Sequence, residues 1–231
     1  MTDDGVVTAL SDGTAVITVT SVARPDLQTT CEVIVKTRYS KAEVGQYIYA
    51  DGNFGNDHSK AVARIIWKGN PGLTDGTLRA DHPQCVHGVA VAMTIYGNDK
   101  FYGYLNSPGS AQSIIEKYED LSQYEIQGYN NTKCLLECYR EAAISNKNQT
   151  IPVFDNLSSH ITPPSTSSGW YIPSRKEVEL VVSTDAHTLS NYGYWISSMP
   201  NSSAVNATYY ESGALKASST DAKRYFYVFA F

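Results

Sequence analysis

The first 36 residues alternate between apolar and polar side chains, the two-residue period expected of strands with one buried face. This pattern predicts strands at residues 5–10, 14–20 and 29–35, with a tight turn at Ser11-Asp12-Gly13. Three strands in about thirty residues make half a sandwich and bury too little apolar surface to fold alone. We therefore expect residues 1–36 to be the C-terminal part of a domain whose first strands lie outside this chain.

After a linker predicted at residues 37–43, the pattern changes to short apolar runs separated by turns. Strands are predicted at 44–49, 61–67 and 87–93, and the first of these ends in the Asp51-Gly52 turn. These runs indicate a second domain that covers residues 44–231.

Apolar positions at helical spacing follow in the middle of the chain. They predict one helix over residues 110–126 and another from Asn131, where Asn131 or Thr132 would cap the exposed N–H groups. The clearest helix start is Ser174, because Ser174 and Glu177 have the Ser-x-x-Glu spacing of a capping box.

Strand patterns return in the last forty residues, at 194–198, 204–212 and 224–231. The two faces of the last strand would carry Phe226, Val228 and Ala230 on one side, and Tyr225, Tyr227, Phe229 and Phe231 on the other. An apolar strand at the end of a chain is typical of a terminus paired inside a sheet. The whole pattern predicts an α+β fold with antiparallel strands, and its helices are expected at 110–126, from Asn131 and from Ser174.

Composition excludes several classes of protein. The 231 residues are 42% hydrophobic and 18% charged, and the net charge is −5 with a pI near 5.5. A basic surface for nucleic acid is not expected, and no apolar run reaches the length of about 20 residues that spans a membrane. The N-terminus lacks a signal peptide, which leaves a cytoplasmic or virion protein, or part of a longer exported one. We favour the exported protein, at the cell surface or outside the cell, since the first domain is incomplete.

Two groups of side chains raise the question of a metal. Zinc ligands are conceivable among Cys31, Cys85, Cys134, Cys138, His82 and His87, but no pair has finger-like spacing, which favours buried or incidental thiols. The oxygens of Asp51, Asn53, Asn56 and Asp57 suggest a calcium loop. Without a bidentate Glu at EF-hand spacing, we favour an ordinary Asp-Gly turn. We expect no metal and no other cofactor.

Two stretches carry resemblances to known families. Gly5 to Thr20 resembles the C-terminal half of a bacterial Ig-like domain of group 2. The run Gly169 to Ser174, with Glu177 and the later Tyr194-Trp195-Ile196-Ser197-Ser198, is similar to C-type-lectin-like domains of the formylglycine-generating-enzyme branch. That branch includes a family of Bacteroides surface proteins. The resemblance covers residues 44–231 and implies a C-type-lectin-like ligand-binding domain.

The closing residues, Arg224 to Phe231, resemble the variable proteins of diversity-generating retroelements. In those proteins, mutagenesis of adenines in Asn codons yields mostly Asn, Ser, Thr, Asp, Gly, Ala or Tyr. Between Ser190 and Tyr227, the chain has 8 Ser, 6 Tyr, 3 Asn and 2 Gly. The resemblance therefore implies a diversified binding surface in this region.

The residue types support a binding surface independently of the resemblance. Tyr offers a large, stiff contact area at low entropy cost, while Ser and Asn offer adaptable hydrogen bonds. The predicted ligand-binding residues are Tyr192, Asn201, Ser202, Asn206, Tyr209, Tyr210, Ser212, Ser218, Ser219, Tyr225 and Tyr227. Tyr is also a good sheet former, and for Tyr194, Tyr209 and Tyr227 a half-buried structural role is an equal alternative.

No catalytic constellation stands out. Formylglycine-generating enzymes use C-terminal cysteines, and this chain has none after Cys138. Neither a nucleophile elbow nor a phosphate-binding loop accompanies His160, His187 or the serines. We expect a non-catalytic, adhesin-like protein whose partner is a protein or glycan at a cell or virion surface. A fixed-sequence adhesin or phage receptor-binding module is the alternative, and an enzyme of the same fold is the third hypothesis.

Overall fold

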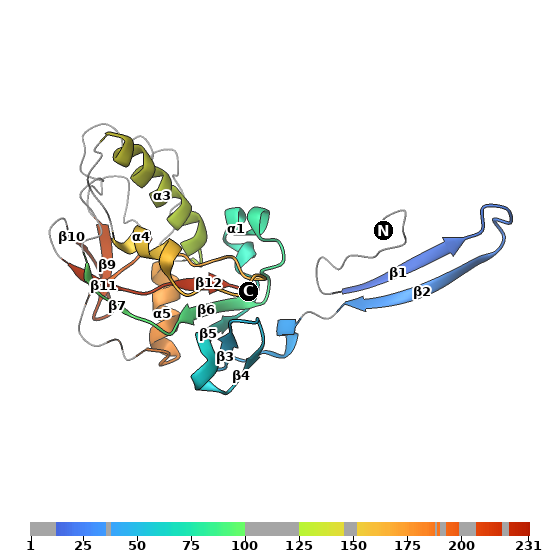
Figure 1. Cartoon of the computed structure of the whole chain (residues 1–231), viewed down its shortest axis with the longest axis horizontal. Helices are drawn as coiled ribbons and strands as arrows, with labels where there is room; N and C mark the ends of the chain where they lie inside the picture. The colour runs from blue at the N-terminus through green and yellow to red at the C-terminus, as the bar shows by residue number, and fades with distance from the viewer. Residues whose placement is uncertain are drawn as a thin grey trace. The chain divides into compact units, whose positions relative to one another are not determined.

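The computed structural model describes residues 13–35, 38–99, 125–145, 152–187, 189, 193–198, 207–218 and 222–231 (Figure 1). The chain divides into two compact units, Met1–Lys41 and Ala42–Phe231. The division falls within the linker expected at residues 37–43. None of the described helices is long and apolar enough to cross a membrane.

Unit 1 contains an antiparallel hairpin of β1 (Gly13–Thr20) and β2 (Gln28–Val35), followed by a short 3-10 helix at Arg38–Lys41. Ile17 lies opposite Cys31 in the register. The strands predicted at 14–20 and 29–35 are therefore confirmed, whereas the strand predicted at 5–10 lies outside the described residues. A hairpin shows strand pairing, and the Ig-like assignment of residues 1–36 stays a prediction.

Unit 2 is built on two five-stranded sheets, the first of which is antiparallel throughout. Its strand order is β12 (Val228–Ala230), β6 (Gly88–Ala92), β5 (Ala61–Lys68), β3 (Tyr47–Tyr49) and β4 (Phe54–Gly55). All five residues of β6 are buried, as its apolar run predicts. Figure 1 shows β12 (red) beside β6 (green), so the end of the chain pairs with the sheet formed by the first strands of unit 2.

The second sheet collects the strands of the C-terminal region. Its order is β10 (Ala214–Ser218), β9 (Ala207–Glu211), β8 (Tyr194–Trp195), β11 (Lys223–Tyr225) and β7 (Tyr96–Asp99). The predicted antiparallel pairing is confirmed for the described strands, with one exception: β11 runs parallel to β8.

The helices confirm the predicted α+β class and correct its details. The described α-helices are α1 (Gly76–Asp81), α3 (Gly128–Ser145), α4 (Pro152–Ser159) and α5 (Arg175–Ser183). Short 3-10 helices also occur at His58–Lys60 and Pro71–Leu73. The C-type-lectin-like resemblance implies two helices, whereas four are described; α1 and α4 are too short to give a long periodic signal in the sequence. The helix expected at 110–126 falls almost wholly outside the described residues.

The helix starts test the capping predictions directly. The capping box is confirmed, since Ser174 Oγ accepts from the Glu177 N–H and the Glu177 carboxylate accepts from the Ser174 N–H. The cap predicted at Asn131 or Thr132 was wrong, because α3 already begins at Gly128. Thr132 Oγ1 instead accepts from the Ile172 N–H at 2.9 Å and donates to the Ile172 carbonyl at 3.2 Å.

The C-terminal residues form the centre of the core and not one continuous strand. The predicted strand 224–231 is divided into β11 and β12 at Phe226-Tyr227, so that its halves belong to different sheets. Phe226, Val228 and Ala230 join the apolar cluster that includes α5, while Tyr225, Tyr227 and Phe229 contact aromatic rings on the other side. Both predicted faces are therefore buried.

Candidate functional site

The β9–β10 hairpin is the described part of the predicted binding region that reaches solvent. The two strands pair from Ala214↔Glu211 to Ser218↔Ala207. The two loop residues, Ser212 and Gly213, both have positive φ angles, of 51° and 83°. Two such residues in a two-residue loop match the right-handed twist of the paired strands. The tip of the hairpin is therefore fixed by backbone geometry, and Ser212 is exposed there.

The base of this hairpin is anchored by aromatic and cationic contacts. Tyr209 is only 7% exposed, and its ring meets that of Trp195 edge to face, with centroids 5.8 Å apart. Lys223 Nζ lies 4.1 Å from the centroid of the Tyr209 ring, a cation–π contact. On the outer strands, Lys216 Nζ forms an ion pair with the Glu211 carboxylate. Tyr209 thus has a supporting role, and half-buried Tyr210 packs in part against the apolar core cluster.

The structure separates the predicted binding residues into groups. Ser212 is exposed and Tyr210 is half-buried, while Ser218 ends β10 at the hairpin end away from the turn. Three predicted binding residues are buried: Tyr209, Tyr225 and Tyr227. The remaining five lie outside the described residues: Tyr192, Asn201, Ser202, Asn206 and Ser219.

The expectation that Tyr225 and Tyr227 lie on an exposed face was wrong. Both are 0% exposed. The Tyr225 hydroxyl donates to Asp99 Oδ2 at 3.1 Å and accepts from Asn156 Nδ2 at 2.6 Å. The Tyr227 hydroxyl donates to the Val153 carbonyl at 2.8 Å. Burial raises the pKa of both phenols, and each hydroxyl has a partner inside the protein.

These two tyrosines belong to a buried aromatic cluster. The Tyr96 ring stacks on Tyr225 with centroids 5.0 Å apart and lies 5.5 Å from that of Tyr227. His160 and Trp170 complete the cluster, and their ring centroids are 4.7 Å apart. His160 Nδ1 is hydrogen-bonded to the Tyr96 hydroxyl, and burial lowers the pKa of His160. The role of this cluster is to join α4 and β7 to the C-terminal strands.

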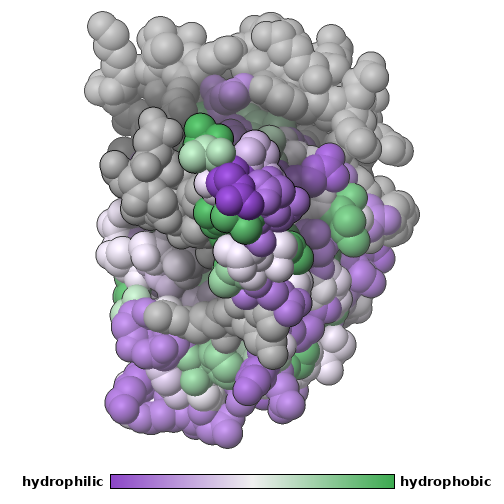
Figure 2. Space-filling model, turned by 90° about the vertical axis from the view of Figure 1, so that its right-hand side faces the viewer, coloured by the Kyte–Doolittle hydropathy of each residue, from purple (hydrophilic) through white to green (hydrophobic). Residues whose placement is uncertain are grey.

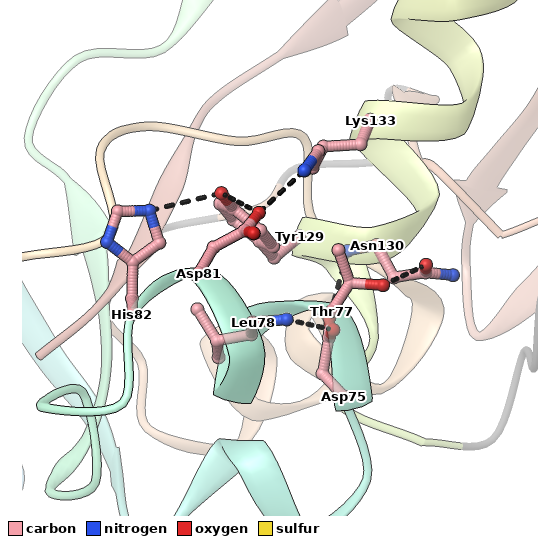
Figure 3. A network of polar contacts seen from close by, with 8 residues as sticks. All are labelled: Asp75, Thr77, Leu78, Asp81, His82, Tyr129, Asn130 and Lys133. Carbon is pink, nitrogen blue, oxygen red and sulfur yellow. Dashed lines mark hydrogen bonds and ion pairs between the residues drawn. The ribbon is translucent and has the colours of Figure 1, made fainter.

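A second polar network connects α1 with α3 (Figure 3). Its inner part is buried Asp75, which accepts from the Leu78 N–H at 2.8 Å and the Asn130 N–H at 2.9 Å. Thr77 Oγ1 also donates to Asn130 Oδ1 at 2.7 Å. Asp75 is therefore the N-cap of α1 and also holds the first turn of α3.

The outer part of the network is more accessible. Asp81 Oδ2 accepts from the Tyr129 hydroxyl at 3.0 Å and from Lys133 Nζ at 2.6 Å, and His82 Nε2 lies 3.1 Å from the same hydroxyl. The hydrogen bond from Lys133 lowers the pKa of Asp81, whereas burial lowers the pKa of His82 and raises that of Tyr129. These shifts keep the His82 imidazole neutral and the Tyr129 phenol protonated. The hydrogen bonds of the network connect α1 to α3. Sequence spacing gave no sign of it, since its residues come from two distant segments.

The candidate metal ligands have other partners. Among the described residues, no group of three His, Cys, Asp or Glu side chains is arranged to hold a metal. Burial raises the pKa of the Cys85 thiol to about 12, and its Sγ contacts the Thr166 carbonyl at 3.6 Å. In the suggested calcium loop, Asp51 Oδ1 accepts from the Asn53 N–H at 2.8 Å, and Asp57 Oδ1 accepts from the Ser59 N–H at 3.1 Å. This is the geometry of an Asx turn and a helix cap.

The exposed apolar residues of unit 2 do not mark a further site. Leu73, Ile161, Val44 and Val182 are between 46% and 75% exposed and come from four separate elements or loops. On the face seen in Figure 2, green apolar residues form small patches separated by purple and white ones. Single exposed apolar side chains of this kind are usual on a soluble surface.

Comparisons with known proteins agree on one group of proteins. No protein-family profile matches the chain. It is 25% identical over 212 residues to "Putative fimbrium tip subunit Fim1C" of Bacteroides ovatus, in a match that covers 74% of this chain and 38% of that protein. A crystal structure of a fimbrial protein from Bacteroides ovatus has the same fold, with a TM-score of 0.55 and 22% identity. That match covers 82% of this chain and 49% of the other. The chain thus spans less than half of either relative and is similar to Bacteroides fimbrial proteins.

Proposed function

We propose that this chain is the non-catalytic, adhesin-like part of a fimbrial subunit and binds a protein or glycan ligand outside the bacterial cell. Similarity to a protein named as a fimbrium tip subunit supports this proposal. A tip subunit is the part of a fimbrium placed to meet another surface. The same similarity supports a cell-surface or extracellular location.

The observation that carries the proposal is the β9–β10 hairpin. Tyr209 is fixed against Trp195, half-buried Tyr210 packs against the apolar core cluster, and Ser212 is exposed at the tip. A tyrosine on a rigid strand loses little side-chain entropy when it binds, and an adjacent hydroxyl adds an adaptable hydrogen bond. The hairpin therefore supplies a preorganised contact surface without a catalytic group.

Two other predicted binding residues, Ser212 and Ser218, lie at opposite ends of this hairpin. Ser212 is at the turn, whereas Ala207 and Ser218 pair at the opposite end. Asn201, Ser202 and Asn206 precede Ala207 in the chain, and Ser219 follows Ser218. The proposal extends to these four residues by their residue types alone, and each can be tested by its own substitution.

The resemblances to C-type-lectin-like domains, Ig-like domains and retroelement variable proteins are part of the same proposal. Residues 44–231 would be a C-type-lectin-like domain, preceded by the linker 37–43 and the C-terminal part of an Ig-like domain at 1–36. The abundance of Tyr, Ser and Asn after Ser190 supports diversification by a retroelement. Genome sequence decides this point: a neighbouring reverse transcriptase gene and an adenine-substituted repeat of this region are expected. Without that repeat, the chain is a fixed-sequence adhesin.

The binding function is tested on an array of glycans and host-surface proteins. Tyr210→Ala should weaken the wild-type hits by about 5- to 30-fold, the loss of about 1–2 kcal/mol typical of a contacting tyrosine. Tyr47→Ala is the matched control, because Tyr47 is also half-buried on a strand but belongs to the first sheet. Equal binding by the wild type and both variants would show that the hairpin is not part of the ligand site. Stability of each variant is measured in parallel, so that unfolding is not read as lost binding.

A further inference from the structure

Two buried carboxylates lie where three helices of unit 2 begin. Asp75 is 1% exposed and caps α1, and Glu177 is 0% exposed in the first turn of α5. The start of α3 lies directly against Glu177. A Cβ atom added at Gly128, the first residue of α3, would be only 2.2 Å from Glu177 Oε2. The three helix starts therefore share one acidic junction.

The Glu177 carboxyl has two hydrogen-bond donors but no cationic partner. The Tyr171 hydroxyl donates to Oε1 at 2.8 Å, and the Ser174 N–H donates to Oε2 at 2.6 Å. Its helix neighbours Val178 and Val181 are 0% exposed. Within the described ranges, no ion pair joins Glu177 to a Lys, Arg or His side chain. An ionised carboxylate here lacks the counter-charge that usually accompanies a buried anion.

Burial and the neighbouring Asp75 carboxylate increase the cost of a charge on Glu177. Burial raises the pKa of Glu177 to about 7, and the hydrogen bonds from Ser174 and Tyr171 oppose that rise while the nearby charge of Asp75 adds to it. Burial raises the pKa of Asp75 as well, and hydrogen bonds from the Asn130 and Leu78 N–H groups oppose that rise. Tyr171 stays neutral, since burial raises its pKa well above the usual value.

The junction is hydrogen-bonded to both sheets. The Ser197 N–H, just after β8, donates to the Pro173 carbonyl at 2.8 Å. The Arg175 N–H donates to Ser198 Oγ at 2.9 Å. Tyr171 exchanges two backbone hydrogen bonds with Val228 of β12, at 2.9 and 3.0 Å. The start of α5 is therefore connected by hydrogen bonds to strands of both sheets, so that a shift of the Glu177 side chain would also affect them.

We propose that Glu177 makes this three-helix junction a proton-dependent joint, which is closed when the carboxyl is protonated and loosened when it is ionised. A carboxyl whose pKa is higher in the folded chain adds stability that is complete below its unfolded pKa. For Glu177 that contribution is complete below about 4.5 and is lost as the pH rises through about 7. The proposal concerns folding alone and does not depend on any ligand.

The first test compares urea unfolding at about pH 5 and about pH 8 for the wild type, Glu177→Gln and Glu179→Gln. Glutamine at 177 keeps the shape and can accept from the Ser174 N–H while donating to the Tyr171 oxygen. Glu179 is the matched control, since it lies on the same helix with a partly exposed carboxylate paired to Arg175. Between these pH values, the unfolding constant should rise about 10- to 100-fold more in the wild type and Glu179→Gln than in Glu177→Gln. Equal pH dependence in all three proteins would overturn the proposal.

A second test uses the wild-type chain alone and keeps the proposal falsifiable if Glu177→Gln does not fold. Carbon-13 NMR of the Glu177 carboxyl should show a titration midpoint near 7. The amides of Arg175 and Ser197 should lose hydrogen-exchange protection as the carboxyl ionises, beyond the intrinsic effect of pH. A midpoint at or below about 5, close to that of an ordinary Glu, would contradict the proposed joint.

Discussion

The burial of Tyr227 gives a direct test of which tyrosines are structural. Its ring is 0% exposed and lies within 5.8 Å, between centroids, of the rings of Tyr96, His160 and Tyr225. Replacement of Tyr227 by Ala should lower the free energy of unfolding by about 3–5 kcal/mol, the usual cost of removing a buried aromatic ring. Tyr227→Phe keeps the ring and loses only the hydrogen bond to the Val153 carbonyl, so about 1–2 kcal/mol is expected.

Tyr210→Ala is the comparison, because Tyr210 is only half-buried where it packs against the apolar core cluster and should cost less, about 1–2 kcal/mol. Urea unfolding followed by tryptophan fluorescence measures all three variants, and unchanged slopes show that the comparison is valid. A cost below about 1 kcal/mol for Tyr227→Ala, together with full stability of Tyr227→Phe, would refute the core assignment of this tyrosine.

Three other predictions use the same purified chain. Ser174→Ala should destabilise it by about 1–2 kcal/mol in urea unfolding, because α5 loses its buried N-cap; a change below about 0.3 kcal/mol would contradict this. Gly128→Ala should cost more than about 2 kcal/mol, since the added methyl group overlaps a carboxyl oxygen, while Gly97→Ala meets no atom within 4 Å and should cost far less. Exposed Cys31 should react with iodoacetamide before buried Cys85. Peptide mass spectrometry measures the order, and simultaneous labelling in the native state would show that the burial is wrong.

Local signals in the sequence predicted local structure well. The Ser174–Glu177 spacing identified the start of α5, because both hydrogen bonds of a capping box join residues only three apart in the chain. The start of α3 was misplaced by three residues for the opposite reason. Thr132 looks like a helix cap in the sequence, but its hydroxyl bonds to Ile172, forty residues away.

The candidate site depended on contacts that a single sequence does not reveal. Tyr209 and Tyr210 are adjacent and identical in type, yet only Tyr209 packs on Trp195. Tyr225 and Tyr227 lie in a strand pattern without a polar face, so the alternation could not distinguish a surface from a second buried side. Their burial follows from the packing of α4 and β7, which provide Asn156, Val153 and Asp99 as partners for the two hydroxyls.

The central claim is that the β9–β10 hairpin contributes to the ligand surface. The most direct measurement is hydrogen–deuterium exchange of the wild-type chain with and without the strongest hit from the glycan and protein array. Ligand binding should slow amide exchange at Tyr210 to Lys216 and leave amide exchange at β3 and β4 of the first sheet unchanged. Protection confined to the first sheet or to the β1–β2 hairpin, with none at Tyr210 to Lys216, would contradict it.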